Sequence, residues 1–325
     1  MSLPKLTLAL SNYDRHLPLL DGTVGVDGFE LEALAVDQTN ALKHGADRHE
    51  RMLQNGEFDV AELSLSSYLM AKSRGMPFTA IPVFPRRLFS QSQMWINANA
   101  GIKSPKDLVG RKVGLNTFQT TLSVLAKGDL QSEYDAPWRK LHWYLSKEET
   151  VDFKAEEGAS IQTIPKGKKI ADMLDEGEID ALLLSRTPQS VINGSKNVCR
   201  LFGDPKAEEL RYFQKVGFYP IMHCVAFKNE VIEKHPGAPR SVFNAFERAK
   251  EVCRRYYDDP NWSRLAWGRH WVEEEQKVFG VDPFPNGVKK NRDNLERFLG
   301  YSKDQGLLEQ DLRVDELFAE STCDT

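Results

Sequence analysis

The stretch from Phe58 to Tyr68, FDVAELSLSSY, constrains the fold more than any other part of the chain. Its first half carries the apolar residues of a short buried strand, and its second half supplies serine hydroxyls before a helix that runs on from Tyr68. In open α/β sheets, ligands bind where the carboxyl end of a parallel strand meets a helix N-terminus, because the helix amides favour an anion. The stretch therefore predicts a ligand-binding turn at the edge of an α/β sheet.

Glu62, Ser64 and Ser67 are the candidate ligand-binding residues of this turn. A carboxylate in the last residues of a core strand is an unusual choice if packing is the only demand on the position. The alternative is that Glu62 points to solvent and that Ser64 only caps the helix. The segment on its own does not decide between the two interpretations.

Composition and charge narrow the class of protein. The chain has 325 residues, enough for two α/β lobes with separate cores. Its net charge of −4 and its scattered Lys and Arg residues give no reason to expect nucleic acid or an anionic membrane as a partner. The cysteines form no CxxC pair, so no zinc ribbon or redox motif is visible. The N-terminus lacks the apolar core of a signal peptide, and no stretch is long enough for a membrane span, so we expect a cytoplasmic protein.

The order of the predicted elements indicates two lobes. Strands and helices alternate from a first predicted strand at Lys5–Leu10, and a later strand, at Lys112–Leu115, ends in another polar turn that contains Asn116 and Thr120. A strand over Phe218–Lys228 returns to the first lobe. We therefore predict an α/β fold in which lobe 2 (98–217) is inserted into lobe 1 (1–97 and 218–325). We expect the ligand cleft between the lobes and a helical C-terminal region.

Two helical patterns complete this prediction. A helix is predicted over Gln38–Gln54, with Asn55 and Gly56 as its stop signal. His44 and His49 lie five residues apart on it, which is not the one-turn spacing of helical metal ligands, so we predict that both are surface residues and that no metal site lies there. The near four-residue spacing of Trp262, Trp267 and Trp271 predicts packing in a core or between lobes.

Four segments of the chain carry a resemblance to a known family: DVAELSLSSYL at Asp59–Leu69, FPRRLFSQS at Phe84–Ser92, FYPIMH at Phe218–His223 and the long block at Val281–Leu307. They resemble the 4,5-dihydroxyphthalate decarboxylase family. The resemblance implies a hinged, two-lobed fold like that of type II periplasmic binding proteins. It also implies a carboxy-lyase that removes CO2 from an aromatic dicarboxylate to give protocatechuate. The mechanism that we expect for this reaction requires no metal and no other cofactor.

Arg86, Arg87 and His223 gain their predicted roles from this resemblance. An adjacent arginine pair is otherwise typical of a solvated surface, but after a strand and before a polar turn one guanidinium could fork onto a carboxylate. A histidine in an apolar strand is by itself more typical of a core. The match of His223 to the Pro-Ile-Met-His motif of the family favours a general acid that protonates the ring carbon.

The remaining roles follow the same interpretation. Glu62 is assigned the base or the catechol-binding role, and one arginine would hold the carboxylate that stays on the ring. Tyr13 and Arg15 occupy a loop after the first strand, where a simple turn fits equally well. The further predicted substrate-binding residues are Ser64, Ser67, Asn116, Thr120, Tyr13 and Arg15.

Other functions stay open from the sequence. The main alternative is a cytoplasmic binding or sensing protein for an aromatic carboxylate, because a fold does not make an enzyme. A third alternative is an enzyme of pyrimidine or menaquinone-precursor metabolism. In each case we expect a small molecule as the partner, and assembly of identical chains is left open.

Overall fold

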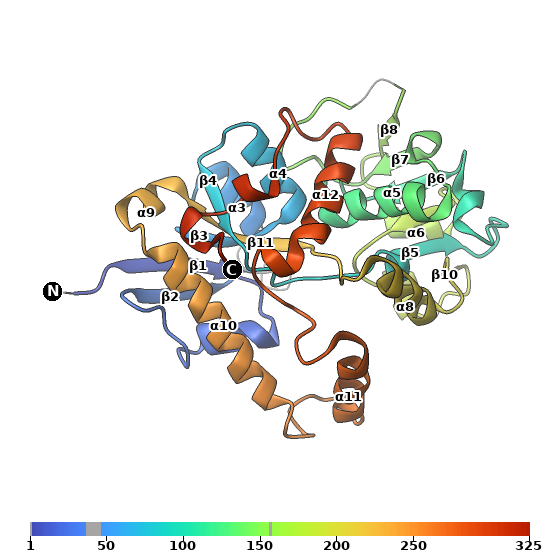
Figure 1. Cartoon of the computed structure of the whole chain (residues 1–325). Coiled ribbons are helices and arrows are strands. Elements are labelled where there is room, and N and C mark those ends of the chain that lie inside the picture. Colours follow the sequence, from blue (N-terminus) through green and yellow to red (C-terminus); the bar gives the residue numbers. More distant parts are fainter. Residues whose placement is uncertain (1, 37–46, 156–157) are drawn as a thin grey trace. The chain divides into compact units, whose positions relative to one another are not determined.

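The computed structural model describes residues 2–36, 47–155 and 158–325, and the chain forms two compact units. Unit 1 comprises Met1–Arg87, Ile221–Leu295 and Leu312–Thr325, and unit 2 comprises Leu88–Pro220 and Glu296–Asp311. Figure 1 shows the elements of both units along the chain. Each unit has its own mixed sheet, so the predicted two-lobed α/β fold with an inserted second lobe is confirmed.

The positions at which the chain passes between the units differ from the sequence analysis. The first passage lies between Arg87 and Leu88 instead of near Ala98, and Glu296–Asp311 belongs to unit 2. Strand β5 (Met94–Asn97) explains the first difference, because it pairs antiparallel with β9 (Ala181–Leu183) in the second sheet. Such long-range pairing leaves no signal in the local sequence of a strand.

The sheet of unit 1 has, among the described residues, five strands in the order β2-β1-β3-β11-β4. β1, β2 and β3 are mutually parallel, whereas β11 is antiparallel to both β3 and β4. The strands are β1 (Lys5–Leu10), β2 (Glu30–Ala35), β3 (Val60–Ser64), β4 (Phe78–Ile81) and β11 (His223–Lys228). The carboxyl ends of β1, β3 and β4 therefore lie at the same edge of the sheet as the first residue of β11.

Helices cover this sheet, and α10 supplies much of the core. Its apolar face, with Val242, Phe246 and Ala249, packs against Leu8 and Leu10 of β1 in one buried cluster. The helices of unit 1 are α1 (Leu17–Leu20), α3 (Arg48–Asn55), α4 (Leu65–Ser73), α9 (Asn229–Lys234), α10 (Ala238–Tyr256) and α11 (Gly268–Phe279). The predicted stop of α3 is confirmed, since Gly56 adopts the left-handed conformation with φ of 58°. The start predicted at Gln38 lies outside the described residues.

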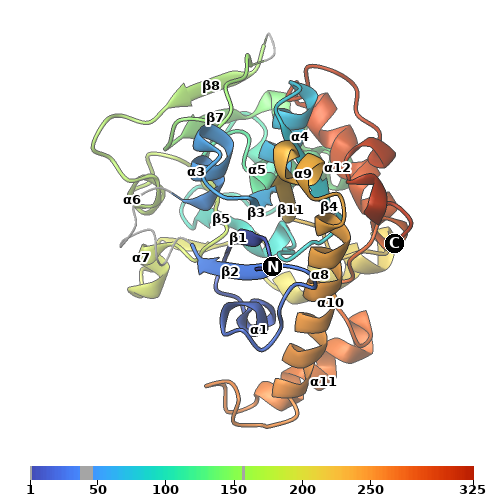
Figure 2. The same cartoon turned by 90° about the vertical axis from the view of Figure 1, so that its left-hand side faces the viewer.

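The predicted core packing of the three C-terminal tryptophans is wrong. Trp262, Trp267 and Trp271 are 40%, 69% and 47% exposed. In the views of Figures 1 and 2, α11 lies beyond the C-terminal end of α10, and Gly268 is its one buried residue among those described. Helical spacing shows that a face is apolar, but it does not show what covers that face.

The sheet of unit 2 has, in the described part of the chain, six strands in the order β10-β5-β9-β6-β7-β8. β6, β7 and β8 run parallel at one side, and β7 and β8 are seen together in Figure 2. The strands besides β5 and β9 are β6 (Lys112–Leu115), β7 (His142–Leu145), β8 (Ser160–Thr163) and β10 (Val198–Arg200). The helices are α5 (Thr121–Tyr134), α6 (Ile170–Asp175), α7 (Gln189–Ile192), α8 (Pro205–Val216) and the part of α12 (Arg292–Asp304) that follows Leu295.

A buried carboxylate joins the helices of unit 2. Asp129 on α5 is fully buried and accepts hydrogen bonds from Ser90, from Tyr212 of α8 and from Tyr301 of α12, at 2.7, 3.0 and 3.1 Å. Burial raises the pKa of Asp129 to about 6, against the lowering effect of these donors.

Among the helices of the described chain, none is both long and apolar enough to span a membrane.

Candidate active site

The strand order of unit 1 brings the polar residues at one sheet edge together. Glu62 is the third residue of β3, and His223 begins β11, where it lies opposite Ser64 in the antiparallel register. The backbone of Arg86, in the loop after β4, accepts the N–H groups of Met222 and His223 at 2.8 and 3.3 Å. The residues Glu62, His223, Arg86, Arg48 and His49 are called the β3–β11 cluster below, and all belong to unit 1.

Glu62 is the centre of this cluster and has no contact with solvent, with 0% exposure. One carboxylate oxygen accepts the Ser11 N–H at 2.8 Å. The other oxygen contacts Arg48 Nη2 at 2.9 Å and His223 Nδ1 at 2.5 Å. Burial alone would raise the pKa of Glu62, but Arg48 and His223 bring it well below its ordinary value. The alternative of a solvent-facing Glu62 is therefore excluded in this structure.

His223 uses one ring nitrogen for Glu62. Because an ionised carboxylate only accepts, Nδ1 donates its hydrogen, and the neutral ring carries its lone pair on Nε2. No described residue gives Nε2 a hydrogen-bond partner. The residue is 7% exposed, and burial lowers the pKa of His223 to about 4 although Glu62 acts in the opposite direction. The ring can therefore accept or deliver a proton at Nε2.

Arg48 and His49, at the start of α3, complete the cluster, and the sequence analysis missed them as functional residues. Arg48 is 2% exposed, and His49 packs its ring edge-on against His223 with 5.0 Å between centroids. His49 Nδ1 accepts the Ser64 N–H at 3.0 Å, which fixes its tautomer. The predicted surface position of His49 differs from the structure, where its side chain is 17% exposed. No signal for Arg48 was present in the sequence, because the helix predicted over Gln38–Gln54 places it in mid-helix.

The two adjacent arginines have different surroundings. Arg87 is 4% exposed, and its guanidinium donates to the Pro285 carbonyl at 2.7 Å and to Asn291 at 2.5 Å. Arg86 is partly exposed, and no side chain in the described ranges forms a hydrogen bond or ion pair with it. Its charge reaches both His223 and Tyr13, where it lowers the pKa of each group. Of the two arginines, Arg86 is the one whose side chain has no partner among the described residues, and its role in binding stays a prediction.

The loop after β1 borders the cluster. Tyr13 is partly buried, and burial and the nearby Glu62 raise the pKa of its hydroxyl. The Arg15 guanidinium is stacked between the rings of Tyr13 and Phe284, each centroid at 4.3 Å, and its Nε donates to the Pro85 carbonyl at 2.6 Å. His16 donates from Nδ1 to the Ser11 carbonyl at 2.8 Å. Tyr13 therefore lies near Glu62 and Arg86, whereas Arg15 holds the loop.

The remaining predicted residues separate into two groups. Ser64 occupies the N-cap position of α4 without a side-chain cap bond, and Ser67 is buried in the first turn of that helix. Asn116 and Thr120 belong to unit 2, where Asn116 accepts a hydrogen bond from Ser146 at 3.3 Å and Thr120 contacts Ser123 at 2.6 Å. A role for these four residues in binding stays a prediction.

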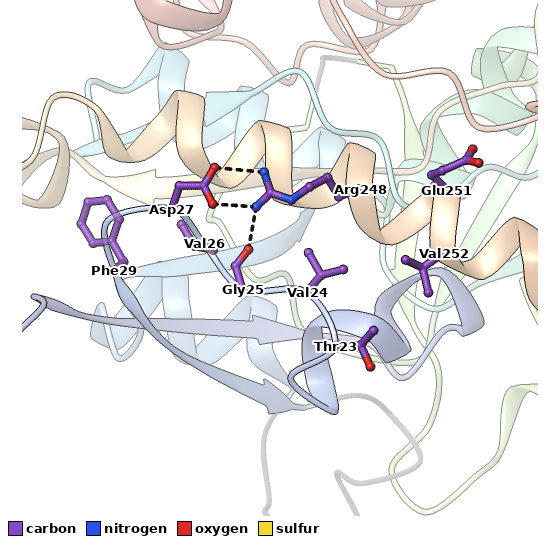
Figure 3. A pocket seen from close by; sticks show the side chains of 9 residues that line it. All are labelled: Thr23, Val24, Gly25, Val26, Asp27, Phe29, Arg248, Glu251 and Val252. Carbon is purple, nitrogen blue, oxygen red and sulfur yellow. Dashed lines mark hydrogen bonds and ion pairs between the residues drawn. The ribbon is translucent and has the colours of Figure 1, made fainter.

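Two further features bear on the choice of site. A surface groove of about 500 Å³ lies between the loop before β2 and α10, as Figure 3 shows, and it shares no residue with the β3–β11 cluster. Its one arginine, Arg248, is paired with Asp27 and the Gly25 carbonyl, so the groove offers little to an acid. No group of three or more His, Cys, Asp or Glu side chains within the described ranges is arranged to hold a metal ion.

Comparisons with known proteins identify relatives of the chain and solved structures that share its fold. The chain is 31% identical to a protein of Comamonas testosteroni named 4,5-dihydroxyphthalate decarboxylase, over 98% of this chain and 97% of that protein. A Pseudomonas putida protein of the same name is 28% identical over 67% of this chain and 85% of its own length. Residues 29–129 match the family model described as NMT1/THI5 like. The periplasmic aliphatic sulphonate binding protein SsuA of Escherichia coli shares the fold, with a TM-score of 0.59 at 11% identity and complete coverage of both chains.

Proposed function

Because the chain belongs to the 4,5-dihydroxyphthalate decarboxylase family and is therefore a carboxy-lyase, we propose that it converts 4,5-dihydroxyphthalate into protocatechuate and CO2. The names of both relatives support this substrate. The single structural observation that carries the proposal is the pairing of His223 with Glu62 beside Arg86, whose side chain has no partner among the described residues.

The substrate itself makes the reaction feasible. Each ring hydroxyl lies para to one carboxylate, so electrons from the phenol oxygen can reach the ring carbon that carries CO2⁻. Protonation of that carbon breaks the aromatic system, and loss of CO2 restores it. The protein must therefore hold the ring, supply one proton to carbon and leave the departing carboxylate poorly solvated.

His223 is the proton donor in this proposal. Its Nε2 is the ring nitrogen that Glu62 leaves available, and Glu62 fixes the ring orientation through Nδ1 at 2.5 Å. Protonated His223 gives its hydrogen to the ring carbon and returns to the neutral form as CO2 leaves. Since Glu62 is fully buried and both its oxygens are occupied, we now assign it the positioning of His223 instead of direct proton abstraction from the substrate.

Arg86 is the proposed binding residue for the carboxylate that stays on the ring. A guanidinium matches a carboxylate with two parallel hydrogen bonds, and this geometry also fixes the plane of the ring. Arg87 is less suited to this task, because its guanidinium already serves Pro285 and Asn291. Tyr13 lies near Arg86 and Glu62 and is our candidate for contact with a catechol hydroxyl.

We propose that the reaction proceeds without a cofactor, since the para hydroxyl donates the electrons that allow the ring carbon to be protonated, and the protonated ring itself accepts the electron pair of the breaking bond to CO2. The test is to incubate chelator-treated protein with 4,5-dihydroxyphthalate and to follow CO2 and protocatechuate. Equal amounts of both products are expected. Binding of the substrate without any product would contradict the proposed activity, and restoration of a lost activity by a metal would contradict cofactor independence.

A further inference from the structure

Two positively charged or chargeable groups share one oxygen of Glu62. The same Oε1 lies 2.9 Å from Arg48 Nη2 and 2.5 Å from His223 Nδ1, while Oε2 is occupied by the Ser11 amide. Arg48 and His223 also approach each other, with 3.5 Å between Nη2 and Nδ1. Both nitrogens carry hydrogens that point to Glu62, so this last contact is not a favourable hydrogen bond.

The position of Arg48 is costly for its helix. It is the first residue of α3, where the helix dipole disfavours a cation, and it is 2% exposed. Its guanidinium is held by the Val36 carbonyl at 3.1 Å and by Asp47 at 3.4 Å, besides Glu62. A buried cation at the wrong end of a helix is therefore not explained by the stability of α3. Its close contact with Glu62 points to a role in the cluster.

Arg48 changes what Glu62 can do for His223. A buried carboxylate with no other counter-ion would stabilise a protonated imidazole, as a neighbouring opposite charge does in general. Here Arg48 already balances the charge of Glu62, and Arg86 adds a second positive charge near the ring. The charged or titratable groups that face His223 are Glu62 from β3, Asp47, Arg48 and His49 from the start of α3, and Arg86 from the loop after β4.

We propose that Arg48 is a positioning residue that, together with burial of the ring, keeps His223 unprotonated in the free protein, so that a dianionic ligand binding at Arg86 causes uptake of one proton by His223. This inference rests on the proposed function, because it requires an aromatic dicarboxylate at Arg86. The ligand neutralises Arg86 and adds negative charge beside the ring, and both effects favour the imidazolium. The general acid is then charged only when substrate is present.

The proton balance of the cycle is complete. Solvent supplies one proton to His223 on binding, and His223 transfers it to the ring carbon when the bond to the carboxylate breaks. Electrons of the ring, supplied by the para hydroxyl, form the new C–H bond, the electron pair of the bond to the carboxylate returns to the ring and restores aromaticity, and CO2 leaves without charge. His223 returns to the neutral form that Arg48 favours, ready for the next substrate.

The experiment is titration calorimetry at pH 7 with phthalate, which lacks the hydroxyls needed for decarboxylation. Repeating it in two buffers of different ionisation enthalpy gives the number of protons taken up. The wild type is expected to take up a substantial fraction of one proton, and benzoate, with one carboxylate fewer, should cause less uptake. Binding of phthalate with no proton uptake would overturn the inference while leaving the anion site intact.

Variants separate the roles. His223→Gln should bind phthalate without uptake, whereas Arg48→Lys, which keeps the positive charge, should retain it. Arg48→Gln should show reduced uptake because Glu62, without its counter-ion, favours a protonated His223 more strongly in the free protein; unchanged uptake in a folded Arg48→Gln protein contradicts the role of Arg48. If Arg48→Gln does not fold, the wild-type and His223→Gln titrations still decide about His223, and a loss of uptake in Arg48→Lys would count against the charge-based role. Failure of the wild type to bind phthalate rejects the proposed anion site itself.

Discussion

Glu62 shows how a single buried side chain can serve a reaction without touching the substrate. Its carboxylate is fully buried, and three donors occupy its oxygens. We expect Glu62→Gln to lower kcat by about tenfold or more, since the neutral amide holds the His223 ring less firmly and no longer favours its protonation. The affinity for phthalate should change little. Steady-state kinetics and phthalate titration measure the two effects, and a variant with unchanged kcat would remove Glu62 from the mechanism.

Arg86 and Arg87 form a matched pair of test positions. Arg86→Gln should weaken phthalate binding by about tenfold to a hundredfold, the loss expected for one charged hydrogen-bonding partner, with little change in thermal stability. Arg87→Gln should instead lower the midpoint of thermal unfolding, because it breaks buried contacts to Pro285 and Asn291. Calorimetry and thermal unfolding distinguish the two. Equal affinity in wild type and Arg86→Gln would place the anion elsewhere.

For single residues, the sequence indicated which polar side chains follow the ends of strands, but it did not indicate which residues far apart in the chain contact each other. Glu62 and Arg86 could be found because polar residues after buried strands gather at one sheet edge. Choosing between Arg86 and Arg87 required coordinates. Arg48 and His223 lie 175 positions apart in the chain, and nothing local connects them. Arg48 begins α3 in the structure, whereas the predicted helix over Gln38–Gln54 places it in mid-helix, so its position could not mark it as unusual.

At the scale of elements, the contact between α5 and α12 is the most restrictive. A Cβ added to Gly128 would lie within 2.2 Å of the Tyr301 ring, whereas one added to Gly203 would meet nothing within 4 Å. Gly128→Ala should therefore destabilise unit 2 by about 1–3 kcal/mol through overpacking. Gly203→Ala is the matched control. Thermal unfolding followed by tryptophan fluorescence measures the difference, because Trp95, Trp138 and Trp143 are buried in unit 2; equal midpoints for both variants would contradict it.

The elements themselves were largely predictable where they were regular. β1 matches its predicted range, Lys5–Leu10, because the alternation of residues is clear. α8 was missed although Asp204 caps it through the Ala207 N–H and Pro205 follows at the first position, so its start signal was present in the sequence. β10 has only three residues and exists through its pairing with β5. Such a strand has too little periodicity to be recognised alone.

For the whole molecule, buried titratable groups predict how stability depends on pH. Burial lowers the pKa of His16 to about 4, so the folded protein stays neutral at this residue while the unfolded chain takes up a proton below its ordinary value of 6.5. The contribution of neutral His16 to the stability of the folded protein is present above pH 6.5 and is lost as the pH falls below this value. The loss between pH 6.5 and pH 5 should be about 2 kcal/mol. His16→Asn should therefore flatten the decline of the thermal midpoint over this range, and an unchanged slope would contradict the assignment.

Asp129 changes the stability with pH in the opposite direction to His16. Because its pKa is raised to about 6 from 3.8, the folded protein binds a proton that the unfolded chain does not bind between these values. Its contribution to stability is present at low pH and is lost as the pH rises through 6, by about 1 kcal/mol between pH 5 and pH 6. The stability that Asp129→Asn loses relative to wild type should therefore be larger at pH 5 than at pH 6. Thermal midpoints at both pH values test this, and a constant difference between the two proteins would contradict it.

The two-lobed architecture was the part of the whole molecule that the sequence predicted best, through the order of its strands and its resemblance to a known family. The site itself depends on register, which local patterns cannot provide: Ser64 and His223 are opposite each other only because β11 returns antiparallel between β3 and β4.

The central claim is that His223 donates the proton that replaces CO2. The most direct measurement compares the rate of protocatechuate formation from 4,5-dihydroxyphthalate by wild type and by His223→Gln at saturating substrate, with phthalate affinity measured for both. We predict a loss of about a hundredfold or more in rate, as for removal of a general acid, with affinity unchanged within about tenfold. A His223→Gln protein that decarboxylates at the wild-type rate would contradict this account.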